Sequence, residues 1–278
     1  DVLIETRRAA TLLGATPSPE ALAARAAHEG LTHLALTDTN ALYGAVAFDR
    51  ACRAVGVHPI LGLAVTTAWP ADLDPLPGEA PARAGLLILL AHNPAGYTSL
   101  CQLSTQIQGH TDREERARRG LTLDDLRASS DGLLCLTGGR RGWAERAVRA
   151  GRPNLAHRYI GKLCGIYAPP QTFVSLEIHT PEDRAVARAL AERADVLGLK
   201  SVAVRPIYTL EPDDRARLQL LAAIAHNCPI GKVPPEGLPD RGDRRVDLHW
   251  PAPQEMAARY ADFPEALAQT QAIAERCA

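Results

Sequence analysis

Short apolar runs rich in leucine, valine and isoleucine alternate with segments of helical periodicity over the first 210 residues of the chain. These runs predict strands at residues 2–6, 33–37, 58–65, 85–91, 132–137, 172–178 and 200–205. Strands that alternate with helices indicate a parallel sheet, because a parallel pair needs a long crossover connection. About seven such units favour a closed or nearly closed β/α barrel, and an open doubly wound sheet is the alternative.

Helix start and stop residues support this pattern. Ser18 before Pro19 predicts a helix that begins there and ends before Gly30. A second helix is predicted to open with Thr180 as its N-cap and to stop at Gly198.

Two polar stretches interrupt the alternation. Residues 109–120 predict a solvated loop or frayed helix, and residues 228–250 are judged too polar for a core element. A last helix is predicted from Pro264, with Ala266, Leu267, Thr270 and Ile273 on one face. We therefore divide the chain into a barrel of residues 1–225 and a part of residues 226–278, whose helices pack on the barrel or lead into a following domain.

Composition narrows the possible functions. Lysine and arginine total 31 against 32 aspartates and glutamates, so any contact with nucleic acid must be local. The six cysteines form no CxxC pair and are expected to be reduced thiols of a cytoplasmic protein. The sequence predicts neither a membrane span nor a signal peptide, and it lacks GxGxxG and GxxxxGK[ST] motifs.

Five segments together resemble a known family, the PHP domain of bacterial C-family DNA polymerases, which include the polymerase III alpha subunit and its error-prone relatives. They are residues 36–65 (LTDTNALYGAVAFDRACRAVGVHPILGLAV), 89–105 (LLAHNPAGYTSLCQLST), 132–142 (GLLCLTGGRRG), 173–199 and 253–277. The resemblance covers nearly the whole chain and implies an α/β fold, a distorted seven-stranded β/α (TIM-like) barrel of the PHP type.

In active proteins that this chain resembles, His, Asp and Glu side chains at the carboxyl ends of the strands hold two or three metal ions. Such a centre needs many converging ligands. By the resemblance, this chain has lost most of these ligands. The lost ligand positions are Glu5, Arg7, Thr39, Ala64, Pro206 and Tyr208.

The remaining ligand positions are Asp38, Glu177 and His179, with His92 expected nearby at the end of the fourth strand. We expect no resident metal and no other cofactor, although these dispersed groups could hold a stray zinc or manganese ion. Asp38 is interpreted as a helix N-cap or turn acceptor rather than a ligand. His179 is interpreted as a hydrogen-bonded residue on the rim of the site.

Two further hypotheses concern charge. Glu177 and Arg7 form an ion pair across the old site, or the space there is a neutral pocket. Arg140 and Arg141, in the GGRRG segment 138–142, are candidates for phosphate binding through backbone N–H groups and guanidinium groups. The alternative is that they are exposed arginines of an ordinary βα turn.

The resemblance implies a non-catalytic PHP domain of, or derived from, a polymerase III alpha-type subunit. It would act as a structural and interaction scaffold in DNA replication or translesion synthesis. Its expected partners are the polymerase body or other replication and translesion proteins, with DNA contacted only indirectly and no membrane. The chain alone is expected to be catalytically inactive, although it resembles part of a DNA-directed DNA polymerase. The alternatives are a metal-dependent phosphoesterase or 3′–5′ exonuclease with altered ligands, and a stand-alone accessory protein of a translesion complex.

Overall fold

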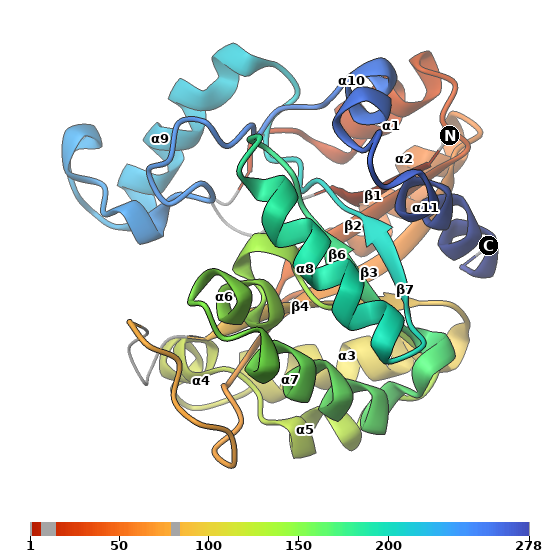
Figure 1. Cartoon of the computed structure of the whole chain (residues 1–278). Coiled ribbons are helices and arrows are strands. Elements are labelled where there is room, and N and C mark those ends of the chain that lie inside the picture. The colour runs from red at the N-terminus through yellow and green to blue at the C-terminus, as the bar shows by residue number, and fades with distance from the viewer. Residues whose placement is uncertain (1, 7–14, 79–83, 278) are drawn as a thin grey trace.

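The computed structural model describes residues 2–6, 15–78 and 84–277 (Figure 1). Its centre is a mainly parallel sheet, to which β1 (Val2–Thr6) adds an edge strand paired with β2. The other strands follow in chain order: β2 (His33–Thr39), β3 (His58–Thr67), β4 (Gly85–Ala91), β5 (Leu133–Leu136), β6 (Thr172–Leu176) and β7 (Lys200–Ala203). Because neighbours in the sheet are also neighbours in sequence, the doubly wound alternative is excluded.

One strand runs against the others. β4 pairs antiparallel with both β3 and β5, so the prediction of a wholly parallel sheet is wrong at this point. In the described part of the connection from Thr67 to Gly85 there is no crossover helix, and a strand that follows without a crossover returns antiparallel. The carboxyl end of β4 therefore lies at the edge where the other strands begin.

Helices surround the sheet (Figure 1). Ser18 caps the first by accepting a hydrogen bond from the Ala21 N–H at 3.2 Å, as predicted. The helices are α1 (Pro19–His28), α2 (Ala45–Ala54), α3 (Pro94–Gln108), α4 (Arg113–Arg119), α5 (Leu123–Arg127), α6 (Trp143–Arg149), α7 (Pro153–Tyr167), α8 (Asp183–Val196), α9 (Arg215–Ala225), α10 (Pro253–Arg259) and α11 (Pro264–Arg276).

The sheet curves around an apolar interior. Side chains from β2 to β7 meet there, among them Ile60, Ile88 and Phe173, and α11 adds Ile273 and Ala274. Helix α11 contacts both β7 and β1, so it fills the space between the two edge strands. The last helix thus packs on the sheet, and Ile273 lies on its buried face as predicted.

A larger apolar layer lies between the sheet and helices α3, α5, α6, α7 and α8. Trp143 is buried in it and donates its indole N–H to the Thr67 carbonyl at 2.8 Å, which ties α6 to the end of β3. Burial of such a side chain contributes roughly 2–3 kcal/mol to folding.

The segment 228–250 corrects a prediction. Although it is rich in polar residues, Val246, Leu248 and Trp250 are buried, and the first two pack against Tyr208 and Leu218. The judgement that this segment was too polar for the core was therefore wrong, because three inward-facing residues are enough to anchor an irregular segment. The division of the chain at residue 225 stays a prediction.

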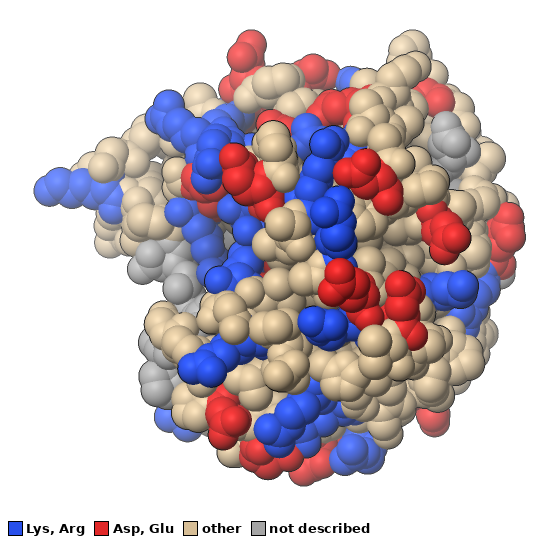
Figure 2. All heavy atoms as spheres, in the orientation of Figure 1, with Lys and Arg blue, Asp and Glu red and all other residues tan. Residues whose placement is uncertain are grey.

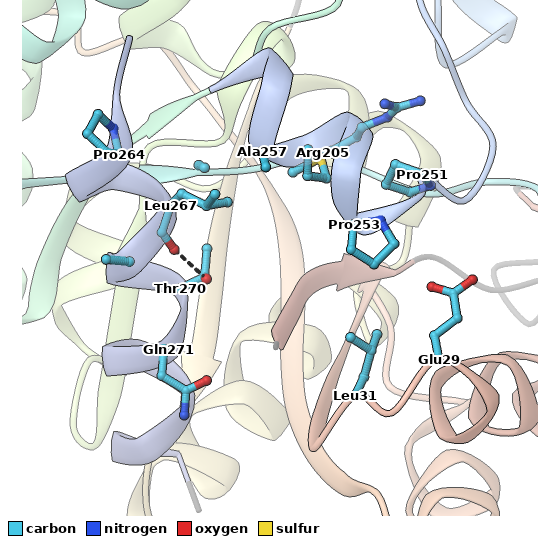
Figure 3. A pocket seen from close by; sticks show the side chains of 13 residues that line it. Glu29, Leu31, Arg205, Pro251, Pro253, Ala257, Pro264, Leu267, Thr270 and Gln271 are labelled. Atoms are coloured by element: carbon cyan, nitrogen blue, oxygen red, sulfur yellow. Dashed lines mark hydrogen bonds between the residues drawn. The ribbon is translucent and has the colours of Figure 1, made fainter. Parts of the chain in front are cut away.

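A cavity of about 640 Å³ lies between α10, α11 and the residues that lead into β2 (Figure 3). Its lining is mainly apolar, with Leu267 and Leu31 approaching from opposite sides. Metal-assisted phosphoester chemistry needs converging oxygen and nitrogen ligands, so this cavity is a poor place for it. No described helix is long and apolar enough to cross a membrane.

Candidate functional site

The carboxyl end of β6 carries two polar side chains that contact each other. Glu177 Oε1 lies 2.8 Å from His179 Nε2, and both side chains are almost fully buried. Burial alone would raise the pKa of Glu177, but the hydrogen bonds from His179 and from the Arg140 N–H, together with the charge of Arg140, outweigh it and hold that pKa below its ordinary value. The carboxylate is therefore ionised at neutral pH.

Both ring nitrogens of His179 are already used. Nδ1 accepts the backbone N–H of Asp247 at 3.3 Å, so we assign the ring proton to Nε2, which donates to Glu177. A histidine binds a metal ion through a free lone pair. In this arrangement the His179 ring has none to offer. His179 is hydrogen-bonded as the sequence predicted, but it is buried rather than on a rim.

The turn after β5 closes over Glu177. The backbone N–H of Arg140 donates to Glu177 Oε2 at 2.7 Å. This approach requires glycine at the preceding position, because a Cβ on Gly139 would stand 2.2 Å from Glu177 Oε2 and its φ is +54°. The backbone donor at Arg140, which the sequence proposed for phosphate, is thus occupied by a carboxylate of the protein itself.

Asp183, at the start of α8, is the hub of the charged side chains around this site. Its carboxylate accepts the N–H groups of His179 and Thr180, each at 2.9 Å, and binds the guanidinium groups of Arg140 at 3.1 Å and Arg149 at 2.7 Å. Burial would raise the pKa of Asp183, but the hydrogen bonds from Arg149 and the two backbone groups lower it to about 2. α8 begins at Asp183 with Glu182 in the N-cap position, so it starts two residues later than the prediction with Thr180 as N-cap.

A second set of charges joins α10 to the ends of β6 and β7. Arg259 donates to Asp247 and Glu255, each at 2.7 Å, and to the carbonyls of residues 178 and 179. Arg205 is buried and binds Glu255 at 2.7 Å. These contacts fix the backbone of Asp247, whose N–H donates to His179. The sequence pointed to none of these residues, since their partners come from distant segments.

Little space remains beside Glu177 and His179. The cavity that they line has a volume of about 20 Å³, enough for about one water molecule. Its walls include the positions that the resemblance marks as lost ligands on the last strand, and apolar side chains from the irregular segment complete them. The remaining lining residues are Leu86, Gly138, Arg140, Arg141, Pro206, Tyr208, Pro239, Val246 and Leu248.

The carboxyl end of β2 is organised around Asn40. Its φ of +58° is tolerated by asparagine, its side chain accepts the Thr66 N–H at 2.9 Å, and its carbonyl accepts from Ser104 and Gln108 of α3. Asp38 is buried inside β2, whereas α2 begins at Ala45 after Gly44. Asp38 is therefore not the N-cap of a helix, and its interpretation as a turn acceptor stays a prediction.

The remaining predicted positions divide into three groups. Thr39 pairs in register with Ala64, at neighbouring places on β2 and β3. His92 lies at the opposite edge of the sheet, because it follows the antiparallel β4, so its expected place near the site is wrong. Arg7 lies outside the described residues, as does the side chain of Glu5, and the proposed Glu177–Arg7 ion pair stays a prediction.

The chain matches the family model of the PHP domain over residues 6–180. The chain belongs to the PHP domain family. Within this PHP domain, the match runs from the end of β1 to the Glu177–His179 pair and ends just before α8.

Curated relatives of the PHP domain are DNA polymerases. The DNA polymerase III subunit alpha of Bacillus subtilis is 26% identical over 267 residues, which cover 96% of this chain and 22% of that protein. The error-prone DNA polymerase of Symbiobacterium thermophilum is 31% identical over 278 aligned residues, covering 92% of this chain and 23% of that protein. The chain thus spans less than a quarter of the length of these relatives.

A solved structure shares the fold. The chain is similar to an amidohydrolase from Chromobacterium violaceum with a TM-score of 0.50, 13% identity, and coverage of 74% of this chain and 87% of that one. At this level of identity the likeness concerns the fold.

The described side chains around Glu177 and His179 offer few free ligands for a centre of two or three metal ions. Within the described ranges, no group of three or more His, Cys, Asp or Glu side chains is arranged to hold a metal ion. His179 has no lone pair open, and Glu177 accepts from both His179 and Arg140. Such a centre needs several ligands free to converge on each ion.

Proposed function

We propose that this PHP domain is a non-catalytic scaffold of a polymerase III alpha-type chain, or of a protein derived from one, in DNA replication or translesion synthesis. The observation that carries the proposal is the filled site beside Glu177 and His179. A volume of about 20 Å³ has room for about one water molecule, which is too little for a phosphoester together with two or three metal ions. Its walls come from residues 239–248 as well as from the strands, so the space has been closed by the chain itself.

The charges around this space support the same role. Asp183 and the Arg205–Arg259 group join the strand ends to α8 and α10 through contacts of 2.7–3.1 Å. Paired buried charges hold their partners in fixed positions, and this suits a domain whose task is to keep its shape against a partner. We take that partner to be a polymerase body, because the curated relatives are polymerases.

The test of the non-catalytic role is metal content, measured by elemental analysis on protein purified without chelators. Beside it, manganese-dependent hydrolysis of a phosphodiester and of single-stranded DNA would be assayed. We expect less than one ion per chain and no turnover above background. Asp38→Ala and Asp49→Ala form a matched pair, because Asp38 is a remaining ligand position buried near the carboxyl end of β2 and Asp49 pairs with Arg53 on α2.

Two or more ions per chain, with hydrolysis abolished by Asp38→Ala and retained in Asp49→Ala, would overturn the proposal. It would then be a phosphoesterase with an altered ligand set. The link to a polymerase is tested separately by the natural reading frame and its neighbours. A frame with neither a polymerase region nor a polymerase gene beside it would contradict that link.

A further inference from the structure

A second cavity, of about 320 Å³, opens on the other side of Arg140, between α6 and residues 239–243. Its wall carries five arginines against two aspartates, and we call it the arginine-lined pocket. Figure 2 shows basic side chains gathered at the upper left of the molecule, over the irregular segment that follows α9. The lining residues are Arg140, Arg141, Arg146, Arg149, Ala150, Pro239, Asp240, Arg241 and Asp243.

The two aspartates of the wall do not cancel this charge. Asp240 is buried and paired with Arg215, a residue outside the lining. Asp243 accepts from Arg140 at 3.1 Å and also from Arg245 at 3.0 Å. Because each carboxylate is shared with a further arginine, the neighbourhood of the pocket keeps an excess of positive charge.

The carboxyl groups behind the wall leave that excess in place. Burial raises the pKa of Glu145 to about 8, even though Arg149 beside it pulls the other way. Glu145 binds Arg149 at 2.6 Å, so it offsets Arg149 and leaves the charge of Arg141 uncompensated. Asp183 is ionised, but it is shared between Arg140 and Arg149.

Arg141 is the open donor of the pocket. Among the described residues its guanidinium group has no hydrogen-bond or ion-pair partner, whereas the neighbouring Arg140 binds two carboxylates. Arg149 also keeps 30% of its side chain exposed. A guanidinium group presents planar, paired N–H donors that match the oxygens of a phosphate.

We propose that the arginine-lined pocket binds a phosphate group, with Arg141 as its principal donor. A volume of about 320 Å³ is at the lower end of the range for ligand pockets, so it suits a phosphate with a small part of the molecule that bears it. The phosphate belongs either to a free monoester or to a nucleic-acid strand. The site is independent of the proposed function because it needs no metal ion, although Arg140 and Arg141 also line the small cavity beside Glu177.

The test is binding to the full chain in the presence of EDTA, so that no metal ion contributes. Inorganic phosphate would be titrated by calorimetry. A labelled ten-nucleotide single strand, with or without a 5′-phosphate, would be titrated by fluorescence anisotropy. We expect saturable binding that weakens as salt rises. Arg141→Gln should weaken it about tenfold, and Arg141→Lys should weaken it less because it keeps the charge.

The matched control is Arg188→Gln, which removes the same charge from an exposed position on α8 and should leave binding unchanged. Tighter binding of the 5′-phosphorylated strand would assign the site to a terminal monoester. Equal binding of both strands, weakened by Arg141→Gln, would assign it to backbone phosphates. Equal effects of Arg141→Gln and Arg188→Gln, or no saturable binding of any probe, would overturn the proposal.

Discussion

The charged side chains on the two sides of the Arg140 turn differ in how fully they are paired. On one side, Glu177 and His179 line a cavity of about 20 Å³, and they and Asp183 meet their partners at 2.7–3.3 Å. On the other side, a cavity of about 320 Å³ is lined by five arginines, and Arg141 has no partner within the described residues. The comparison teaches that polar side chains at the end of a strand need not face a cavity for a ligand, because neighbouring groups of the protein can bind them. The positive charge that is left over faces outward on the other side.

Removal of the Asp183 carboxylate should give the largest loss in the free energy of unfolding. Asp183→Ala leaves two guanidinium groups and two backbone N–H groups without their acceptor, so we expect a loss of about 3–5 kcal/mol in the free energy of unfolding. Urea denaturation near neutral pH would measure it. Because the pKa of Asp183 is lowered to about 2, its stabilising effect is present above an ordinary pKa of 3.8 and is lost as pH falls toward 2.

The control for this variant is Asp262→Ala. Asp262 is about half exposed and lies 3.9 Å from Arg184, so its removal should cost less than about 1 kcal/mol. Equal losses in the two variants would mean that the network around Asp183 adds no more than a surface ion pair.

The Glu145→Gln substitution should change the free energy of unfolding less than Asp183→Ala does. Its effect should depend on pH in the opposite direction. The pKa of Glu145 is raised to about 8 in the folded chain, so the folded state holds a proton that the unfolded state releases above its ordinary pKa of 4.5. The contribution of this group to stability therefore falls as pH rises from about 5 to 8, by roughly 2–3 kcal/mol. Between pH 5 and pH 8, the unmodified chain should lose this amount of stability relative to Glu145→Gln, because glutamine does not titrate. A difference that stays constant between pH 5 and pH 8 would show that Glu145 is ionised.

The smallest changes in the free energy of unfolding are expected for two adjacent arginines, Arg140 and Arg141, and the two should differ. Arg140→Gln breaks contacts with Asp183 and Asp243 and should lower the free energy of unfolding by about 1–2 kcal/mol. Arg141→Gln breaks no side-chain contact with the described residues and should change it by no more than about 0.5 kcal/mol. Thermal unfolding under identical conditions would compare them. If both variants lost the same stability, the contrast between the two sides of the turn would fail.

Local chemistry made the ends of some elements predictable. Ser18 and Pro19 mark the start of α1 because a side-chain acceptor and a fixed φ suit the first turn whatever packs against it. The direction of β4 was not predictable, because an apolar run reads the same in either direction. Because β4 is reversed, His92 lies at the edge of the sheet opposite to the one that we predicted.

The candidate site was predicted in one respect and missed in another. The resemblance singled out Glu177 and His179, which lie together at the end of β6, whereas the lost ligand positions such as Ala64 and Pro206 stay predictions. It could not reveal what occupies the space. Asp183 binds an arginine 43 positions away in the chain, and Leu248 closes the site from a segment judged too polar for the core. Such partners are chosen by the tertiary structure.

Helix α11 links the two ends of the chain. Because it touches both β7 and β1, contacts form between residues 264–276 and residues 2–6, with almost the whole sequence between them. Contacts of such long range cost chain entropy before they contribute any energy, and they slow folding. During synthesis on the ribosome, β1 can pair with β2 early, but its contact with α11 must wait until the last helix emerges. Until then one side of the apolar interior is open, and we expect this interval to be the period when the nascent domain is most prone to aggregate.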